Sequence, residues 1–291
     1  MWVCCGCDAY TVLKPKIINR KRSVMPAFMA QHGMPYWIDL MSSDVRKSAH
    51  FYSELLGWEF EETVPGYRLA RCQGLPVAGL IAQPEDSNAA DLWVTHFLAD
   101  DIEATVAQAR ELGGAVFAPP TEVQLGSMAL LADPAGALFG VIEPHSEEAF
   151  VAGGEPGTAV WHELTCTNHY VEAVEFYSEL FGWATASIEG ARYTTALADG
   201  AAFAGVWGGP ESHVPSFWST YVGVKDAGAA CEKAVALGGE VVREPWDSEF
   251  GRMCVVADST GAAVTLCEVD EPVVEGHEGD PLAGIDLSNL S

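Results

Sequence analysis

Six side chains of this sequence are of types that could carry chemistry: Trp37, Asp39, His96, Trp161, Glu163 and Tyr221. In two places a carboxylate follows a tryptophan by two residues, and in an extended strand this spacing puts both side chains on one face. A carboxyl group in apolar surroundings can have a raised pKa and act as a base, and a histidine or tyrosine can donate or relay a proton. We therefore take the two carboxylates, His96 and Tyr221 as candidate catalytic residues, and all six as candidate contacts to a substrate.

These residues belong to an internal repeat. Residues 36–60 read YWIDLMSSDVRKSAHFYSELLGWEF, and residues 161–183 read WHELTCTNHYVEAVEFYSELFGW. Further along, a constant offset of 125 residues relates His96–Glu143 to Tyr221–Glu268 without a gap. Similarity over so long a stretch indicates a tandem duplication of one structural unit. His96 and Tyr221 are therefore equivalent positions of the two copies.

Each copy predicts the same elements around these residues. The first strand alternates in polarity, and the helix after it begins at Asp44 and ends at Gly57. Phe51 and Leu56 of that helix face the core. In the second copy Asn168 stands at the start of the equivalent helix. A second strand–helix pair and further strands follow, so the unit β-α-β-β-β is expected four times, in the α+β class.

The repeat also sets the expected segment boundaries. They are a disordered N-terminal extension (1–33), a first domain (34–145), a linker (146–157), a second domain (158–270) and a polar C-terminal tail (271–291). The extension contains a basic cluster and Met25 and Met29, and Met34 follows it. A misassigned start codon is the leading explanation for the extension, and a short basic tail is the alternative.

Composition and charge exclude several classes of function. The 291 residues are 49% hydrophobic and 19% charged, as is typical of a globular protein. They include 41 acidic and 15 basic side chains, a formal net charge of −26. Such a surface repels nucleic-acid phosphates and anionic lipids. No apolar run reaches the length of about 18 residues that a membrane span needs. The expected location is the cytoplasm.

The eight cysteines support the same location. Cys4 and Cys7 form a CxxC pair, but no second pair follows at the spacing of a zinc site. The five cysteines after position 71 stand in apolar contexts and are predicted to be small buried residues. Reduced, buried cysteines are typical of cytoplasmic proteins.

Three motifs carry a family resemblance. F-Y-S-E-L-[LF]-G-W follows the first helix, L-G-G the second, and D-P-A-G or D-S-T-G precedes the last strand of each copy. Together they resemble the glyoxalase/bleomycin-resistance superfamily, also called vicinal oxygen chelate proteins. W-[IH]-[DE]-L is similar to the start of two-domain glyoxalase-like proteins of high-GC bacteria. The resemblance covers about residues 35–144 and 158–269. It implies tandem glyoxalase-like domains, each with two βαβββ units curling around a cavity.

The resemblance implies where a divalent metal would bind in metal-dependent members. Its usual ligand positions are occupied here by Trp37, Val94 and Gly140 in the first copy and by Trp161, Ser219 and Thr265 in the second. None of these side chains is a ligand for Zn, Ni, Mn or Fe. No cofactor is therefore predicted, and a divalent metal would need other ligands. A shift of one residue would bring His162 to the first position.

Two interpretations of the carboxylates stay open. The resemblance implies that each cavity holds one carboxylate, one tryptophan, and either His96 or Tyr221. The carboxylates could instead accept hydrogen bonds from backbone amides or a buried arginine, with Arg68, Arg192 and Arg252 as candidates. His96 and Tyr221 occupy equivalent positions and can both form hydrogen bonds, but only the histidine is a base near neutral pH. This difference favours either a binding role in both copies or a catalytic role in only one copy.

The second copy is richer in aromatic residues, which favours a flatter ligand there; the additional ones are Trp207, Trp218 and Trp246.

The first functional hypothesis is a protein that binds and transforms a small organic molecule by lyase-like or hydroxylase-like chemistry without the usual metal. The second is a non-catalytic binding or drug-sequestering protein. The third is a metal-dependent glyoxalase or dioxygenase. The expected partner is a small molecule, and the chain is expected to be a monomer or a homodimer.

Overall fold

The computed structural model describes residues 30–84, 86–145, 153–248 and 251–270, which fall within one compact unit of the chain. Cys4 and Cys7, the tail at 271–291 and most of the extension at 1–33 lie outside the described residues. Within the described ranges, no helix is long and apolar enough to cross a membrane.

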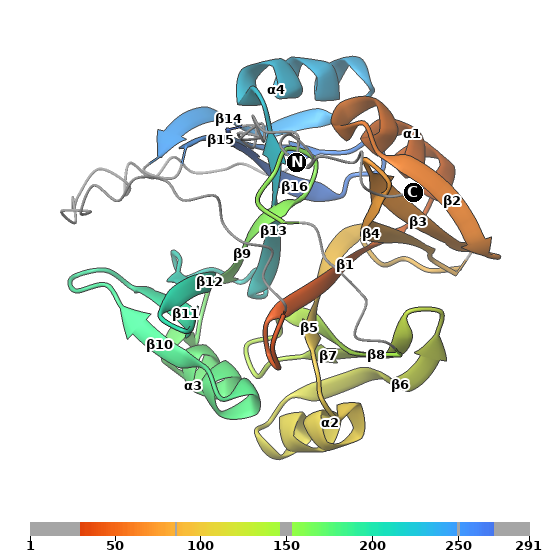
Figure 1. Cartoon of the computed structure of the whole chain (residues 1–291). Helices are drawn as coiled ribbons and strands as arrows, with labels where there is room; N and C mark the ends of the chain where they lie inside the picture. The colour runs from red at the N-terminus through yellow and green to blue at the C-terminus, as the bar shows by residue number, and fades with distance from the viewer. Residues whose placement is uncertain (1–29, 85, 146–152, 249–250, 271–291) are drawn as a thin grey trace, which may run out of the picture. The chain divides into compact units, whose positions relative to one another are not determined.

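The first copy of the repeat forms one curled sheet of eight strands with two helices (Figure 1). Its first unit consists of β1 (Pro35–Ser42), α1 (Val45–Leu56), β2 (Glu59–Val64), β3 (Tyr67–Cys72) and β4 (Leu75–Ala82). Its second unit consists of β5 (Leu92–Leu98), α2 (Ile102–Glu111), β6 (Ala115–Val123), β7 (Gly126–Ala132) and β8 (Leu138–Pro144).

The second copy forms an equivalent sheet. Its first unit consists of β9 (Ala159–Cys166), α3 (Tyr170–Phe181), β10 (Ala184–Ser187), β11 (Tyr193–Ala198) and β12 (Ala201–Gly208). Its second unit consists of β13 (Phe217–Val224), α4 (Ala227–Ala236), β14 (Glu240–Ser248), β15 (Gly251–Ala257) and β16 (Ala263–Glu268). The predicted fourfold βαβββ order and the α+β class are confirmed.

Strand order places the candidate residues at the centre of each sheet. The orders are β2-β3-β4-β1-β5-β8-β7-β6 and β10-β11-β12-β9-β13-β16-β15-β14. The first strand of each unit thus lies in the middle, and the two such strands of a sheet pair antiparallel. Because β1 and β9 carry the W-x-[DE]-L motifs, both motifs lie on central strands.

Local sequence explains where the helices begin and end. The Asp44 carboxylate accepts hydrogen bonds from two backbone amides at the start of α1, and Gly57 ends the helix with φ +74°. In α3 the prediction was wrong by one residue. The N-cap is His169, in the left-handed conformation at φ +48° and without a side-chain capping bond, rather than Asn168. The second copy has one more residue between Trp161 and Phe176 than the first has between Trp37 and Phe51, and the N-caps of the two helices differ.

The cores under the helices are shared between the two copies. One core joins β1, α1, β3 and β4 with β13, α4, β15 and β16, and the other joins the remaining units. Accordingly, α1 lies beside α4 and α2 beside α3 (Figure 1). Ser48 of α1 also donates to Asp258 of the other copy at 3.2 Å. Each copy therefore depends on the other for half of its helix-side packing.

Residues just before the first strand belong to this packed structure. The backbone N–H of Gly33 donates to the carbonyl of Leu98 at 2.8 Å. Its own carbonyl accepts from the indole of Trp183 in the second copy, also at 2.8 Å. The folded part thus begins before residue 34, where the predicted first domain starts.

Candidate functional site

We define the inner face of each sheet as the face opposite its helices. Residues directly paired in a ladder project to the same face. Trp37 pairs with His96, which pairs with Gly140, while Asp39 pairs with Val94 and Gly79. The structure therefore brings Trp37, Asp39 and His96 together on the first inner face.

On this face Asp39 is the centre of what we call the Asp39 cluster: Trp37, Asp39, Tyr67 and His96. Its side chain is 0% exposed. Oδ1 accepts from the indole N–H of Trp37 and from the hydroxyl of Tyr67, both at 3.1 Å. Burial and the charge of Asp39 raise the pKa of Tyr67, so its hydroxyl stays protonated and donates. A fully buried carboxylate thus has two fixed donors on one oxygen.

The second oxygen of Asp39 makes a different contact. His96 Nε2 lies 3.0 Å from Oδ2, close enough for an ion pair. Among the described residues, however, neither the two nitrogens of the His96 ring nor Oδ2 of Asp39 make a hydrogen bond. The two side chains are thus in close contact without a hydrogen bond between them. Room for these groups comes from two glycines, since a Cβ on Gly79 would collide with Asp39 and Tyr67, and one on Gly140 with the His96 ring.

The second inner face carries the Glu163 cluster: Trp161, Glu163, Tyr193 and Tyr221. The hydroxyl of Tyr193 donates to Oε2 at 2.8 Å and that of Tyr221 donates to Oε1 at 3.0 Å. All four side chains are half-buried. Burial raises the pKa of the Glu163 carboxyl, and the two tyrosine hydrogen bonds oppose that shift. The structure therefore gathers the second set of candidate residues as well, around a more accessible carboxyl group.

Tyr67 and Tyr193 are the site residues that the sequence reasoning missed. It proposed arginines as structural partners, but Arg68 lies 3.6 Å from Glu62, and Arg192 lies over the Tyr170 ring. The partners of the carboxylates are instead the tyrosines next to these arginines: Tyr67 comes just before Arg68, and Tyr193 comes just after Arg192. A signal existed in the sequence, because both copies have a tyrosine at this position.

The additional tryptophans of the second copy divide between two environments. Trp207 pairs with Tyr193, and Trp246 pairs with Met253, so both lie on the inner face or its margin. Trp218 is buried in the helix-side core, where its indole donates to Tyr177 at 2.8 Å. Two of the three tryptophans can therefore contact a ligand on the second inner face, and Trp218 cannot.

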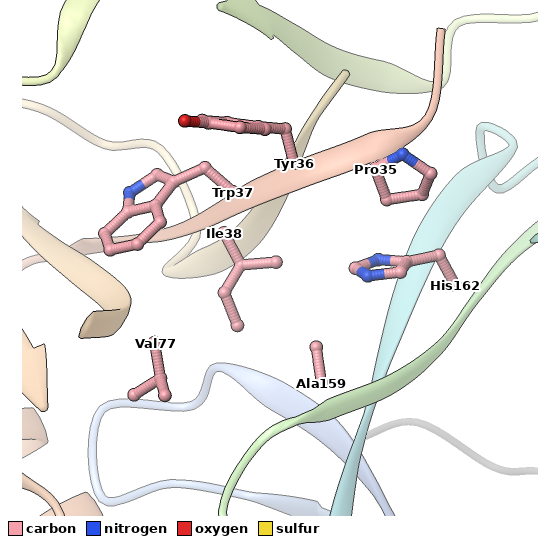
Figure 2. A pocket seen from close by; sticks show the side chains of 7 residues that line it. All are labelled: Pro35, Tyr36, Trp37, Ile38, Val77, Ala159 and His162. Carbon is pink, nitrogen blue, oxygen red and sulfur yellow. The ribbon is translucent and has the colours of Figure 1, made fainter. Parts of the chain in front are cut away.

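A small pocket lies where the two copies meet (Figure 2). Its lining comes from both copies: Pro35, Tyr36, Trp37, Ile38, Val77, Ala159 and His162. Its volume of about 20 Å³ suits a water molecule and not an organic ligand.

His162 belongs to this junction and not to an inner face. Its backbone pairs with Thr220, on the opposite face of β9 from Glu163. Its Nδ1 lies 3.1 Å from the hydroxyl of Thr95, and burial lowers its pKa to about 4. The histidine is neutral at physiological pH.

The described residues contain no group of three or more His, Cys, Asp or Glu side chains placed to hold a metal ion. At the usual ligand positions Trp37, Val94 and Gly140 share the inner face with Asp39 and His96. A carboxylate and an imidazole already in mutual contact are too few donors for a transition-metal site, which commonly takes at least three protein ligands. The side chains present do not fit a metal of the usual kind.

Both copies of the repeat match one protein-family model. The family model described as Glyoxalase/Bleomycin resistance protein/Dioxygenase superfamily matches residues 36–141 and again 161–266. The chain belongs to this superfamily. The two matches contain both inner-face clusters, so these clusters lie within the superfamily's own domain.

Curated relatives span almost the same length as the chain. CFP32 of Mycobacterium tuberculosis, which bears the provisional name of a glyoxylase, is 32% identical over 248 residues, or 81% of this chain and 95% of that protein. The anthracycline biosynthesis protein DnrV of Streptomyces peucetius is 31% identical over 264 residues, or 82% and 94%.

Solved structures share the fold of this superfamily member. The Mn(II)-bound glyoxalase from Novosphingobium aromaticivorans superposes with a TM-score of 0.58 at 17% identity, covering 83% of this chain and 84% of that one. The 2,3-dioxygenase LapB from Pseudomonas sp. KL28 also gives a TM-score of 0.58, at 13% identity and with 84% and 95% coverage. At these identities the likeness concerns the fold.

Proposed function

We propose that the chain binds a small organic molecule on the second inner face and exchanges a proton with it through Glu163. The observation that carries this proposal is a half-buried carboxyl group with a raised pKa, held between the hydroxyls of Tyr193 and Tyr221. Asp39 occupies the equivalent position in the first copy but is fully buried. Glu163 is the less buried of the two acidic residues, which favours it as the one that a ligand contacts.

The chemistry that fits this geometry is general acid–base catalysis. A carboxyl group whose pKa is raised toward neutrality can accept a proton from a carbon or hydroxyl acid and return it. Each tyrosine hydroxyl fixes one carboxylate oxygen and can relay a proton or bind a ligand oxygen. Proton abstraction followed by loss of a leaving group, as in a lyase, needs no group beyond these.

The surrounding side chains favour a flat ligand. Trp161 and Trp207 are half-buried on the same face as Glu163, and indole rings stack well on planar molecules. Two curated relatives, DnrV and DauV, are named for anthracycline biosynthesis, and anthracyclines are planar polycyclic compounds. The proposed substrate class is therefore a planar aromatic compound with an acidic proton.

A non-catalytic binding protein is the second candidate, and Tyr221 favours it. The first copy has His96 at this position, where an imidazole could act as a base near neutral pH, whereas a tyrosine hydroxyl is a poor base there. Analysis of the ligand after prolonged incubation separates the two candidates. A transformed product that depends on Glu163 supports the enzyme, and unchanged ligand supports the binding protein.

A thermal-shift screen with planar aromatic compounds tests the proposal itself. At a ligand concentration of about 100 times Kd, binding should raise Tm by roughly 5 °C. Glu163→Gln should abolish the shift. Asp39→Asn is the matched control, which should lower the starting Tm but keep the ligand-induced shift. Shifts that persist in Glu163→Gln would place the ligand elsewhere.

A further inference from the structure

A stacked arginine lies on the second sheet. The guanidinium carbon of Arg243 stands 3.7 Å from the ring centroid of Trp246, and both side chains are half-buried on β14. Stacking on an indole favours one orientation of the guanidinium plane, and it leaves the N–H donors at the edge of that plane to make other contacts.

Ladder register places this pair on the inner face. Tyr221 pairs with Thr265, Thr265 pairs with Val255, and Val255 pairs with Arg243. Because directly paired residues project to one face, Arg243 lies in the same row as the Tyr221 of the Glu163 cluster. Trp246 pairs with Met253 on that face. The same face of the sheet therefore carries the Glu163 cluster on its central strands and the Arg243 cation on β14, its edge strand.

The first sheet shows that the fold does not need this pair. At the repeat offset of 125 residues, Arg243 corresponds to Ala118 and Trp246 to Thr121. β6 forms the same ladder with β7 through these residues as β14 does with β15. The same ladder therefore forms with alanine and threonine at these positions, which leaves the arginine and the tryptophan available for a role in binding.

From this arrangement we infer that Arg243, stacked on Trp246, binds the carboxylate of an aromatic ligand whose other end reaches Glu163. This inference rests on the proposed function of the second inner face and names its substrate class as aromatic carboxylates. A guanidinium has five donors in a planar fork that matches a carboxylate, so it can bind the ligand in addition to the contacts that Arg243 already makes. The net charge of −26 otherwise disfavours anions, so a local cation decides their binding.

The experiment compares 2-naphthoate with 2-naphthamide, two planar ligands of nearly equal shape that differ in charge. Affinities are measured by calorimetry at neutral pH for the full chain and for Arg243→Met. Wild-type protein should bind naphthoate about tenfold or more tightly than naphthamide, since charge-assisted bidentate bonds are the stronger kind. Arg243→Met should remove that preference and leave the affinity for naphthamide within about twofold. Arg243→Ala, which copies the first sheet, is the second variant.

Arg252→Met is the matched control, because it removes the same charge from the neighbouring strand. Arg252 is exposed and pairs with Asp247, away from the inner face. The inference would be overturned if the wild type bound the two ligands with equal affinity, or if Arg252→Met lost the preference for naphthoate as fully as Arg243→Met. In either case, naphthamide binding that depends on Glu163 would leave the proposed function standing. Binding of neither ligand would overturn both.

Discussion

The first inner face buries its carboxylate completely, whereas Glu163 on the second inner face is only half-buried. On the first, Trp37 packs with Leu69 and Ile142 in a separate apolar cluster over the sheet. The equivalent positions of the second copy hold Thr195 and Cys267, which are smaller. Two sheets with the same strand order thus differ at these positions in side-chain volume. Both copies keep the same scaffold, and under the proposed function the first inner face is structural.

The two carboxylates also differ in burial, which is greater in the first copy. Asp39 is held by an indole and a phenol and contacts a histidine, and it is fully buried. Glu163 is one methylene longer and reaches two tyrosine hydroxyls at a half-buried position. Stabilisation of the fold should therefore depend mainly on Asp39, and ligand binding mainly on Glu163.

The largest expected effect is on stability. Asp39→Ala removes an acceptor shared by the buried Trp37 indole and the Tyr67 hydroxyl, and it empties space at a fully buried position, so the free energy of unfolding should fall by about 3 kcal/mol. Glu163→Ala should lower it by less than about 1 kcal/mol, because its tyrosines are half-buried and can bond to water. Urea denaturation of both variants measures the difference. Equal losses would mean that the two clusters are both structural.

His162, at the junction of the two copies, should make the free energy of unfolding depend on pH. His162 replaces Ile38 of the first copy, and burial lowers its pKa from 6.5 to about 4. The unfolded chain therefore binds more protons than the folded chain between these values. Its contribution to stability is complete above about pH 6.5 and falls by up to roughly 3 kcal/mol as the pH drops to about 4.

Comparing stability against pH for the wild type and His162→Ile isolates this contribution. The variant copies the residue of the first copy, so its curve should be flatter between about pH 6.5 and 4. Parallel curves would show that His162 is protonated without cost in the folded protein.

Filling the second inner face should convert it into a copy of the first. Thr195→Leu combined with Cys267→Ile introduces the residues found at the equivalent positions of the first copy. We expect loss of ligand binding, with a fall in the free energy of unfolding of about 1–3 kcal/mol, as is typical when larger side chains are introduced into a packed region. Calorimetric binding and denaturation of the same sample check both parts. Retained binding in a folded double variant would separate the ligand site from this face.

The smallest effect concerns the residues before β1. A chain that begins at Met34 lacks Gly33 and its bonds to Leu98 and Trp183, so it should unfold about 1 kcal/mol more easily than one that begins at Met29. Thermal unfolding of the two truncated chains is the measurement. Identical Tm values would show that the Gly33 contacts contribute nothing.

The sequence predicts more of the fold than of the site. Periodicity and the repeat are enough to place the central strands, because alternation fixes which side chains share a face. Tyr67 was missed since it lies on a different strand, 28 residues from Asp39, and no local pattern relates the two. The sequence also did not predict that the two copies share their cores. Both copies have the same apolar pattern, and packing of the units within a copy would bury it as well as packing across the two copies.

Calorimetry with the best compound from the thermal-shift screen gives the number of ligand molecules bound per chain. We expect one ligand molecule per chain, with binding lost in Glu163→Gln and retained in Asp39→Asn. Two equivalent molecules per chain, or binding that requires Asp39 and not Glu163, would contradict the assignment of the second inner face as the ligand site.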